Sequence, residues 1–540
     1  MNCYMGDEYI RCNIYMNDVP LYNNRVSVSF SDSTNFSGKV NLPRCEVSGD
    51  SVFRNCTSLN APIFVPNTFN SMRSAFYGCT NYNSLVTFEE HSNISDFAYI
   101  FADCTKYNRA TTFPDSIYNN CIYSRAFASC THFNQPIIIG NGANYLDYMF
   151  MNCNRFNQEI LIPNTASNLY GMFDNCTSYN KPLHIPNSAN NIDCRYMLSR
   201  CRNYNQITII PDSVVGCIFM FSGCASLNSD VYIGNNVTTC RNLFAYNTLR
   251  FNDNGKYVAP IFDANVYIGK NVNDCSNMFK ELSNFNKPLN IPDSVTDCSD
   301  MLSYCENYNS VIRLGNNVTN CRNMLSQSYL RNGSFNQSIV VPNSVRDCRA
   351  MLYHQTSFDQ PVTIFNGVEN CSSMLAYCYN FNQDITIPGS VNSCASILQY
   401  CNEFNSTVIF EEGIEICSSA LAECTRFNRP VTIPNSVVNC VFMFHNCFNF
   451  DQDVYVPDSV NNYVGILEVS SGFEYSYSHT ISIPRPAYST PQQIGYGTGL
   501  RAEQQTLGAR IVVRSTGEVA TVKEGFYDNG QHKNYYWEVS

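Results

Sequence analysis

The sequence predicts a right-handed α/β repeat solenoid of about 17 coils with a parallel sheet, followed by a small C-terminal β-barrel. Three observations support this prediction. At 540 residues the chain exceeds the size at which a single hydrophobic core stops growing. An apolar pair recurs at a nearly constant spacing through most of the chain. Each unit also contains a short alternating strand that typically ends at proline.

The composition is that of a folded chain with a net negative charge. Charged residues make up 14% of the sequence and aromatic residues 13%, and the net charge is −11 without any run of lysine or arginine. Enough apolar residues are present to bury an extensive core. Because phosphate backbones are bound mainly by cationic side chains, we do not expect nucleic acid as the main partner.

The first 21 residues mix acidic and apolar residues and have neither a basic start nor a continuous apolar stretch. We therefore expect no secretory signal, and we expect the chain to fold in the cytosol. No segment approaches the roughly 20 apolar residues that span a membrane, so we expect no membrane insertion.

The register of the repeat is marked by the second residue of a recurring pair, typically Met-Phe or Met-Leu. Neighbouring marks are 23 residues apart in eleven of sixteen intervals, and the others measure 25, 26, 25, 35 and 27. Such regularity indicates stacked units that bury their apolar sides against one another. The register marks are Phe53, Phe76, Phe101, Phe127, Phe150, Phe173, Leu198, Phe221, Phe244, Phe279, Leu302, Leu325, Leu352, Leu375, Leu398, Leu421 and Phe444.

Each unit is predicted to contain one short strand and one short helical piece. Cys417, Leu421 and Cys424 lie at i, i+4 and i+7, the spacing of one face of a helix or of a tight-turn segment. Val431 and Ile433 alternate around an outward threonine before a proline ends the run. We expect the strands of successive units to pair and their apolar faces to form one continuous core.

An asparagine that follows an aromatic residue or leucine recurs in most units. Its expected role is a ladder that satisfies backbone groups between adjacent coils, because a buried polar side chain needs a hydrogen-bond partner. A polar surface stripe is the alternative. The predicted ladder includes Asn134, Asn157, Asn205, Asn286, Asn382 and Asn428.

The repeat resembles a known family. The residues Met443-Phe444, Cys447 and Phe450-Asp451-Gln452, with the strand end Ile433 to Val437, are similar to BspA-like leucine-rich repeats with an MF-x-x-C-x-x-FNQ signature. The resemblance covers about residues 45–460 and implies a leucine-rich-repeat solenoid with a role in adhesion or host recognition. Such repeats also occur in bacteriophage structural proteins. The chain departs from surface adhesins because we recognise no secretion signal or cell-wall anchor.

Seven units carry two cysteines seven residues apart. On a helix this spacing separates the thiols by about 10 Å, which is beyond disulfide reach. Equivalent thiols of adjacent coils could still come close. A cytosolic origin favours small buried thiols that fill the core. The pairs include Cys217/Cys224, Cys371/Cys378 and Cys417/Cys424.

The sequence has no recognisable metal site or catalytic motif. Zinc sites commonly use ligand pairs two to four residues apart, and no such cysteine pair occurs. The seven histidines are scattered over different repeats, and none forms a motif with a serine or cysteine nucleophile. We therefore expect a non-enzymatic protein without a cofactor.

The two ends of the chain are predicted to form small modules. Residues 1–45 are expected to be a cap or an attachment module, and residues 46–460 the solenoid. Residues 461–499 are expected to form a strand-containing connector and linker, and residues 500–540 a small β-domain. Turn signals at Thr516-Gly517 and Asp528-Asn529-Gly530 predict two hairpins there. They resemble an SH3-like barrel of the KOW type, which implies binding to nucleic acid or protein; a docking or capping domain is the alternative.

The outward residue of each strand contributes to a strand-face ridge that is unusually apolar for a solvent-exposed surface. The preference of strands for β-branched residues is one explanation, and a binding surface is the other. The ridge consists of Phe64, Thr87, Thr112, Ile138, Leu161, His184, Ile209, Tyr232, Tyr267, Asn290, Arg313, Val340, Thr363, Thr386, Ile409, Thr432 and Tyr455.

Two tyrosines of the ridge, Tyr232 and Tyr267, fall on consecutive coils, and the 35-residue interval inserts a loop between them. Tyrosine and arginine are frequent anchors of recognition surfaces, and loops inserted into repeat arrays often lie on the binding face. We therefore predict a binding site for a protein or glycan partner formed by Tyr232, Tyr267, His184, Arg313, Lys256 and Tyr257.

Three functions are compatible with the sequence. The first is a virion-exposed bacteriophage tail or head-fibre protein, made in the host cytoplasm, that recognises a host surface and contacts other virion proteins through its terminal modules. The second is a bacterial or protist cell-surface adhesin, and the third is an intracellular protein-binding scaffold. We favour the first, because an adhesin-like solenoid here lacks a recognised export route.

Overall fold

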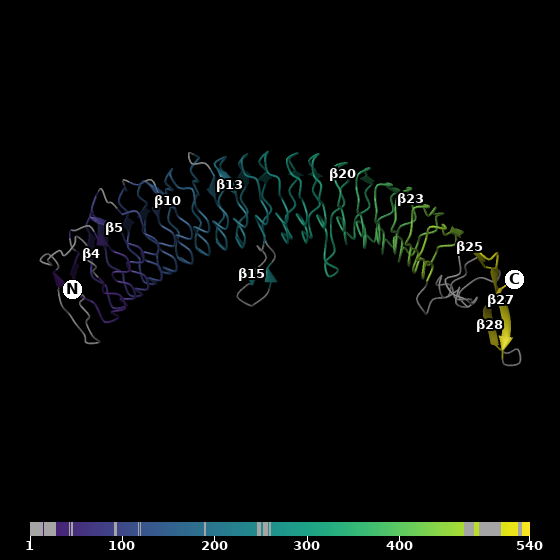
Figure 1. Ribbon diagram of the computed structural model, residues 1–540, viewed down its shortest axis with the longest axis horizontal. Coiled ribbons are helices and arrows are strands. Elements are labelled where there is room, and N and C mark those ends of the chain that lie inside the picture. Colours follow the sequence, from purple (N-terminus) through teal and green to yellow (C-terminus); the bar gives the residue numbers. More distant parts are fainter. Residues whose placement is uncertain are drawn as a thin grey trace. The chain divides into compact units, whose positions relative to one another are not determined.

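The structure, a computed structural model, describes most of the repeat region and parts of both ends. The chain divides into two compact units, Met1–Phe285 and Asn286–Ser540, and each is described by itself. Within each unit, similar coils stack side by side (Figure 1). The described residues are 14–15, 29–42, 44, 47–90, 94–116, 118, 120–187, 191–245, 250–251, 257–258, 261–468, 480–484, 509–527 and 532–539.

In most coils one side forms a short parallel strand, as the alternating pattern predicts, but the expected strands at residues 160–162, 183–185 and 431–433 do not form. Equivalent residues of neighbouring strands pair in register, so Phe64 lies beside Thr87 and Val340 beside Thr363. The paired strands are β4 (Ile63–Val65) with β6 (Val86–Phe88), β7 (Thr111–Thr112) with β9 (Ile137–Ile138), β12 (Thr208–Ile210) with β14 (Val231–Ile233) and β17 (Val266–Tyr267), β18 (Leu289–Asn290) with β19 (Ile312–Arg313), β20 (Ile339–Val341) with β21 (Val362–Ile364), and β22 (Ile385–Ile387) with β23 (Val408–Phe410).

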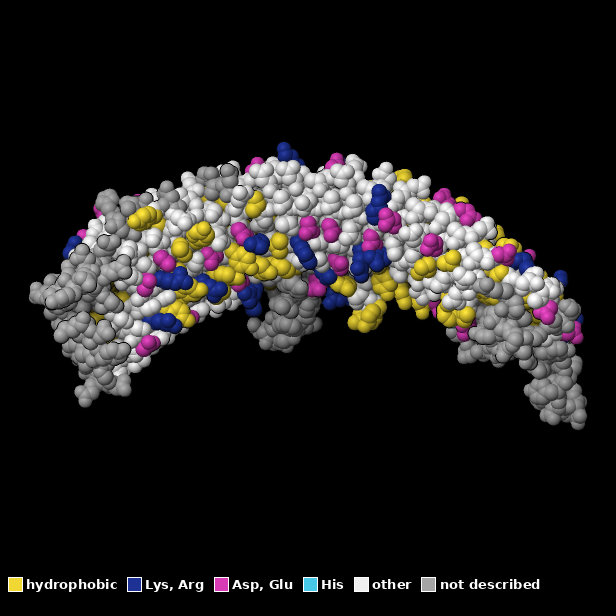
Figure 2. Space-filling model, in the orientation of Figure 1, with side chains coloured by type: hydrophobic (Ala, Val, Ile, Leu, Met, Phe, Trp, Pro, Cys, Tyr) yellow, Lys and Arg dark blue, Asp and Glu magenta, His cyan; other side chains and the backbone are white. Residues whose placement is uncertain are grey.

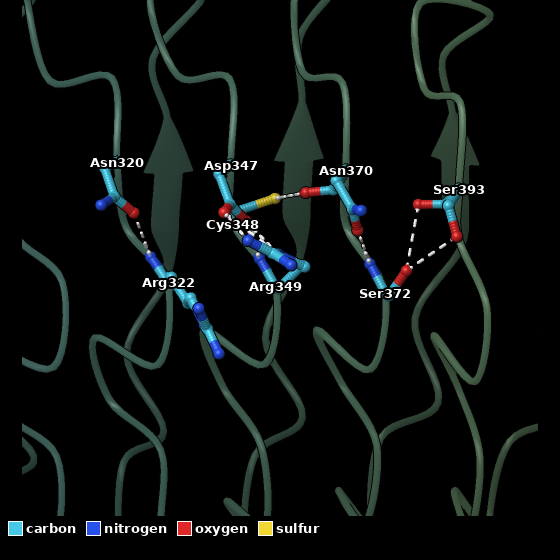
Figure 3. Close-up of polar contacts among 8 residues, drawn as sticks. All are labelled: Asn320, Arg322, Asp347, Cys348, Arg349, Asn370, Ser372 and Ser393. Carbon is cyan, nitrogen blue, oxygen red and sulfur yellow. Dashed lines mark hydrogen bonds and ion pairs between the residues drawn. The ribbon is translucent and has the colours of Figure 1, made fainter.

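A second parallel ladder runs along another side of the coils. Single bridges join Asn320 to Asp347, Asp347 to Asn370, and Asn370 to Ser393, and Figure 3 shows these four residues on successive coils. The Oδ1 atom of Asp347 accepts a hydrogen bond from the backbone N–H of Arg349 (3.0 Å), which fixes the turn that follows. Longer stretches of this ladder are β3 (Val47–Ser48) with β5 (Phe69–Ser71), β8 (Cys121–Ile122) with β10 (Ala143–Tyr145), and β11 (Ile192–Asp193) with β13 (Val214–Gly216).

The segment around each register mark is a run of turns, so the expected helical piece is wrong for the part of the chain that the structure describes. Backbone N–H groups point alternately along the chain and across to the next coil. Tyr77 donates to the carbonyl of Ser74 within its own coil (3.1 Å). Phe76 donates to Ile100 of the next coil (2.8 Å), and Ser74 donates to Ala98 (2.8 Å). Because every second N–H bonds across coils, an α-helical pattern cannot form.

Left-handed backbone conformations recur two residues before and two residues after most register marks. In one coil these residues are Ser74 (φ 55°) and Gly78 (φ 72°), and in a later coil they are Tyr148 (φ 54°) and Asn152 (φ 63°). A right-handed helix has no place for such residues. They reverse the chain direction repeatedly, and this keeps the apolar residues between them turned toward the core.

The core is a continuous stack of aromatic and aliphatic side chains from successive register marks. Phe150 is fully buried, and its ring lies parallel to those of Phe127 and Phe173 with centroids 5.5 and 5.6 Å away. Phe156 of the same coil adds a third stacked ring at 4.5 Å. Offset stacking of this kind stabilises the fold beyond simple area burial.

The 25 described cysteines are all free and buried. Many of the thiols that follow a register mark by three residues donate to a backbone carbonyl of the preceding coil. The Sγ–H of Cys79 donates to the carbonyl oxygen of Phe53 (2.9 Å), and that of Cys424 donates to Leu398 (3.1 Å). Equivalent thiols of adjacent coils do come close at Cys217 and Cys240, whose Sγ atoms are 3.8 Å apart. The cysteines therefore act as small apolar residues that also satisfy buried carbonyl groups.

The recurring asparagines are joined by hydrogen bonds from coil to coil. The Oδ1 atom of Asn134 accepts from the backbone N–H of Asn157 (2.9 Å), and Oδ1 of Asn382 accepts from Asn405 (2.8 Å). Contrary to the expected burial, Asn382 is exposed and Asn134 is half-buried. The ladder therefore runs along the surface of the coils.

We expect replacement of Asn382 by alanine to lower the free energy of unfolding by about 0.5–1.5 kcal/mol, the usual net contribution of an accessible hydrogen bond. The variant loses the acceptor of the Asn405 N–H and one of the two acceptors of the Ser406 Oγ–H, which keeps the backbone carbonyl of residue 382. Denaturant unfolding measures the change. Asn380→Ala is the matched control, because Asn380 is an exposed asparagine of the same coil outside the ladder. Equal stability of the two variants would contradict the ladder.

Coil-like structure continues on both sides of residues 46–460. The N–H of Phe30 donates to the carbonyl of Val52 (2.7 Å), and its ring stacks on Phe53 with centroids 5.6 Å apart. Closer to the N-terminus, β1 (Ile14–Tyr15) pairs in parallel with β2 (Val40–Asn41). At the other end, the N–H of Phe444 donates to the carbonyl of Ile466 (2.8 Å).

The C-terminal strands extend the repeat sheet, and the described residues show no separate SH3-like barrel. Strands β24 (Val454–Tyr455), β25 (Thr480–Ile483) and β26 (Arg510–Val513) are parallel. Strands β27 (Val519–Tyr527) and β28 (His532–Val539) then add antiparallel neighbours, as the two turn signals predict. Because β25 occupies the free edge of β26, the two hairpins complete a five-stranded sheet with the last coil.

The long interval in the first unit contains an antiparallel hairpin. Strand β15 (Arg250–Phe251) pairs with β16 (Tyr257–Val258), and Figure 1 shows the hairpin projecting from the stack of coils. The predicted binding residue Lys256 lies outside the described residues.

Candidate functional site

The strand-face ridge is exposed along its whole length, since all of its seventeen members are accessible to solvent. Several apolar members are far more exposed than buried, including Leu161 (83%), Ile209 (63%) and Val340 (61%). Other exposed apolar residues, Ile207 and Val311 among them, lie two positions before ridge residues and immediately precede their strands. Because contiguous exposed apolar surface often marks an interaction site, the ridge is a candidate binding surface.

Within the first unit, the ridge carries a pair of stacked tyrosines. Tyr232 and Tyr267 pair in register on β14 and β17, and their rings are nearly parallel, with centroids 4.5 Å apart. The pKa of Tyr232 is raised, mainly by desolvation and secondly by the neighbouring Tyr267 hydroxyl. Both side chains remain accessible to solvent, Tyr232 to 39% and Tyr267 to 50%. Rigid, amphipathic aromatic groups of this kind are common anchors of protein recognition.

The structure places the other predicted binding residues as follows. His184 is exposed on the same ridge, two coils before Tyr232. Tyr257 belongs to β16, but its side chain lies outside the described residues. Arg313 belongs to the second unit, so its surroundings are described there. The structure thus places Tyr232 and Tyr267 in contact. The wider site of six residues stays a prediction.

Arg313 lies in a groove on the strand face of the second unit. The groove spans three successive coils, from β19 across β20 to the end of β21. Its walls are mainly apolar, and we call it the Arg313 groove. It is lined by Val311, Ile312, Arg313, Leu314, Asn316, Ser338, Val340, Pro342, Asn343 and Phe365.

A row of aromatic and arginine side chains on the turn side of the first unit was not predicted. The guanidinium of Arg125 lies between the rings of Tyr99 and Tyr148, 5.8 and 4.7 Å from their centroids. Tyr148 contacts Tyr170, which in turn contacts Tyr196. Most of these residues stand two positions before a register mark, and this recurrence is the signal that could have revealed the row.

The face of the molecule in Figure 2 carries hydrophobic patches among interspersed basic and acidic side chains. Among the described residues, no group of three or more histidine, cysteine or acidic side chains is arranged to hold a metal ion. The described part of the chain also contains no helix with the length and apolar character needed to cross a membrane.

The family is decided by comparison with protein-family models. The model described as "Mycoplasma protein of unknown function, DUF285" matches residues 121–210, 211–289 and 319–432, which is more than half of the chain. The chain belongs to the DUF285 family. The N-terminal part of this DUF285 protein, residues 26–157, also matches the model of the BspA type leucine-rich repeat region in six copies. The predicted resemblance to BspA-type repeats is therefore confirmed.

Two solved structures are similar to this DUF285 protein at low identity. A leucine-rich repeat protein from Bacteroides ovatus is 16% identical over 76% of this chain and 83% of its own, with a TM-score of 0.42. A leucine rich cell surface protein from Faecalibacterium prausnitzii is 14% identical over 84% and 81%, with a TM-score of 0.23. No curated protein matches.

Proposed function

We propose that this DUF285 protein is a non-enzymatic adhesion protein that binds a protein partner through its strand-face ridge at a cell surface. The observation that carries the proposal is the exposed strand-face ridge, in which nine of the seventeen outward residues are apolar or aromatic and paired parallel strands align their outward residues. Folded proteins rarely leave such a row uncovered without an interaction that uses it.

The BspA-type repeats support adhesion as the general role. None of the matches described above is a phage protein, so we propose the cell-surface adhesin, the alternative in the sequence analysis, in place of a virion component. An intracellular scaffold would use the same ridge. The location of the protein on intact cells distinguishes these possibilities.

We expect the double variant Tyr232→Ala/Tyr267→Ala to lose attachment to a target surface, because the two tyrosines form a stacked, exposed aromatic pair on the ridge. Beads coated with the full chain are tested for attachment to a panel of animal and bacterial cells and to immobilised extracellular-matrix proteins. Truncating two interface anchors typically costs at least 2 kcal/mol of binding free energy, about a thirtyfold loss of affinity.

The matched control is Tyr118→Ala, because Tyr118 is also an exposed tyrosine of the first unit but is not part of the ridge. Both variants are expected to unfold at the wild-type temperature. Unchanged attachment of the double variant would remove the tyrosine pair from the proposed surface. Attachment to no cell or matrix protein, together with antibody labelling only of permeabilised cells, would favour the intracellular scaffold.

A further inference from the structure

The Arg313 groove combines exposed apolar side chains with a single charged group. Val311, Val340 and Phe365 are 49%, 61% and 42% exposed although they line a concave surface. No aspartate or glutamate belongs to the lining. A pocket that is mostly apolar and contains a few well-placed polar groups is the usual form of a binding site.

The charge of Arg313 is available to a ligand. Arg346 and Arg349, on the following coil, have their own carboxylate partners, Glu369 at 3.9 Å and Asp347 at 2.6 Å. No ion pair of Arg313 occurs among the residues that the structure describes. A guanidinium can bind a carboxylate through two parallel hydrogen bonds, and the apolar walls strengthen this interaction by lowering the local dielectric constant.

We propose that the Arg313 groove binds an extended segment of a partner protein in which an aspartate or glutamate lies between apolar residues. The carboxylate would pair with Arg313, and the flanking apolar side chains would cover Val340 and Phe365. The side-chain amides of Asn316 and Asn343 line the groove and can bond to peptide groups. This inference rests on the proposed function, because it names the kind of partner that the second unit recognises.

The chemistry of the lining favours a peptide over an acidic sugar. A uronic acid would bring several hydroxyl groups into the groove, and each would need a hydrogen-bond partner to offset its desolvation. Besides Arg313, only Asn316, Ser338 and Asn343 offer polar side chains, and the other walls, Val311, Ile312, Leu314, Val340, Pro342 and Phe365, supply none. An acidic peptide with apolar neighbours matches both the charge and the apolar walls.

The experiment uses the full chain and a capped pentapeptide, Ala-Leu-Asp-Leu-Ala, with binding measured by saturation-transfer NMR and calorimetry. We expect the peptide to bind, and we expect its Asp-to-Asn analogue and the protein variant Arg313→Gln each to weaken binding about tenfold. Val340→Asp should abolish binding, because it places a negative charge beside the carboxylate. Val438→Asp is the control, since Val438 is an exposed apolar residue of the same unit that lies outside the ridge. Arg426→Gln controls for loss of an exposed arginine in the same unit.

Several outcomes would overturn the proposal. They are equal binding of the Asp and Asn peptides, equal losses in Val340→Asp and Val438→Asp, or Arg313-dependent binding of galacturonate with no binding of peptide. If the full chain attaches to its target surface through the tyrosine pair but binds no acidic peptide, the groove assignment fails and the proposed adhesion function stands.

Discussion

Replacement of Phe150 by alanine is expected to destabilise the first unit by about 3–5 kcal/mol, the usual cost of truncating a buried phenylalanine. The ring is fully buried and stacks on Phe127, Phe156 and Phe173, so its removal interrupts the aromatic core between three coils. Because neighbouring coils interact mainly with each other, the loss should be concentrated near the substitution. Hydrogen exchange of the backbone amides around residues 127–173 measures it.

Leu161→Ala is the control for this substitution, because Leu161 belongs to the same coil and is 83% exposed on the ridge. Surface substitutions of this kind usually change stability by less than about 0.5 kcal/mol. Similar protection in both variants would show that Phe150 does not occupy the core position described above.

The 25 described cysteines are expected to be unreactive toward a thiol reagent in the folded chain and fully reactive after unfolding without a reductant. The thiolate is the reactive form, and burial raises the pKa of the thiols, in the case of Cys79 to about 12. At neutral pH the buried thiols are therefore both protonated and shielded. A colorimetric thiol count before and after denaturation measures the change.

Asn380→Cys is the control, since it introduces one exposed thiol that should react at once in the folded protein. Reaction that appears only when a reductant is added to the unfolded chain would show disulfides. That result would contradict free thiols in the coils and the cytosolic folding expected from the sequence.

The period, the strands and their outward residues could be predicted because each depends on a local pattern that repeats. The alternation of Val431 and Ile433 around Thr432 correctly predicts that Thr432 is exposed, although residues 431–433 form no strand. The recurrence of asparagine at the same position of most repeats likewise predicted hydrogen bonds between coils. Their exposure could not be predicted, because spacing along the chain does not show how tightly neighbouring coils cover a position.

The helical piece was mistaken because the spacing i, i+4 and i+7 suits a run of turns as well as a helix. Left-handed conformations usually signal glycine or asparagine, but here Tyr148, Arg125 and Ser74 adopt them. The cross-coil hydrogen bonds hold these residues in place, and no local pattern reveals such bonds.

The described residues do not show the expected C-terminal barrel, and the sequence did not predict the Arg313 groove, for a related reason. Turn signals locate hairpins, but they do not show that β26 pairs with β25 and so joins the repeat sheet. Arg313 was singled out from the ridge alone. Its groove also depends on Phe365, which is contributed by a coil two repeats further along the chain.

The hydrogen bonds between turns also have a consequence for how the chain acquires its structure. Partners lie one coil apart, so their separation is only 22 residues between Phe53 and Ala75 and 34 residues between Cys240 and Asp274. The entropic cost of closing such a loop grows slowly with its length and does not depend on total chain length. Each coil can therefore be added to the growing stack as soon as it leaves the ribosome. A chain of 540 residues thus folds with the short contact distances of a much smaller protein.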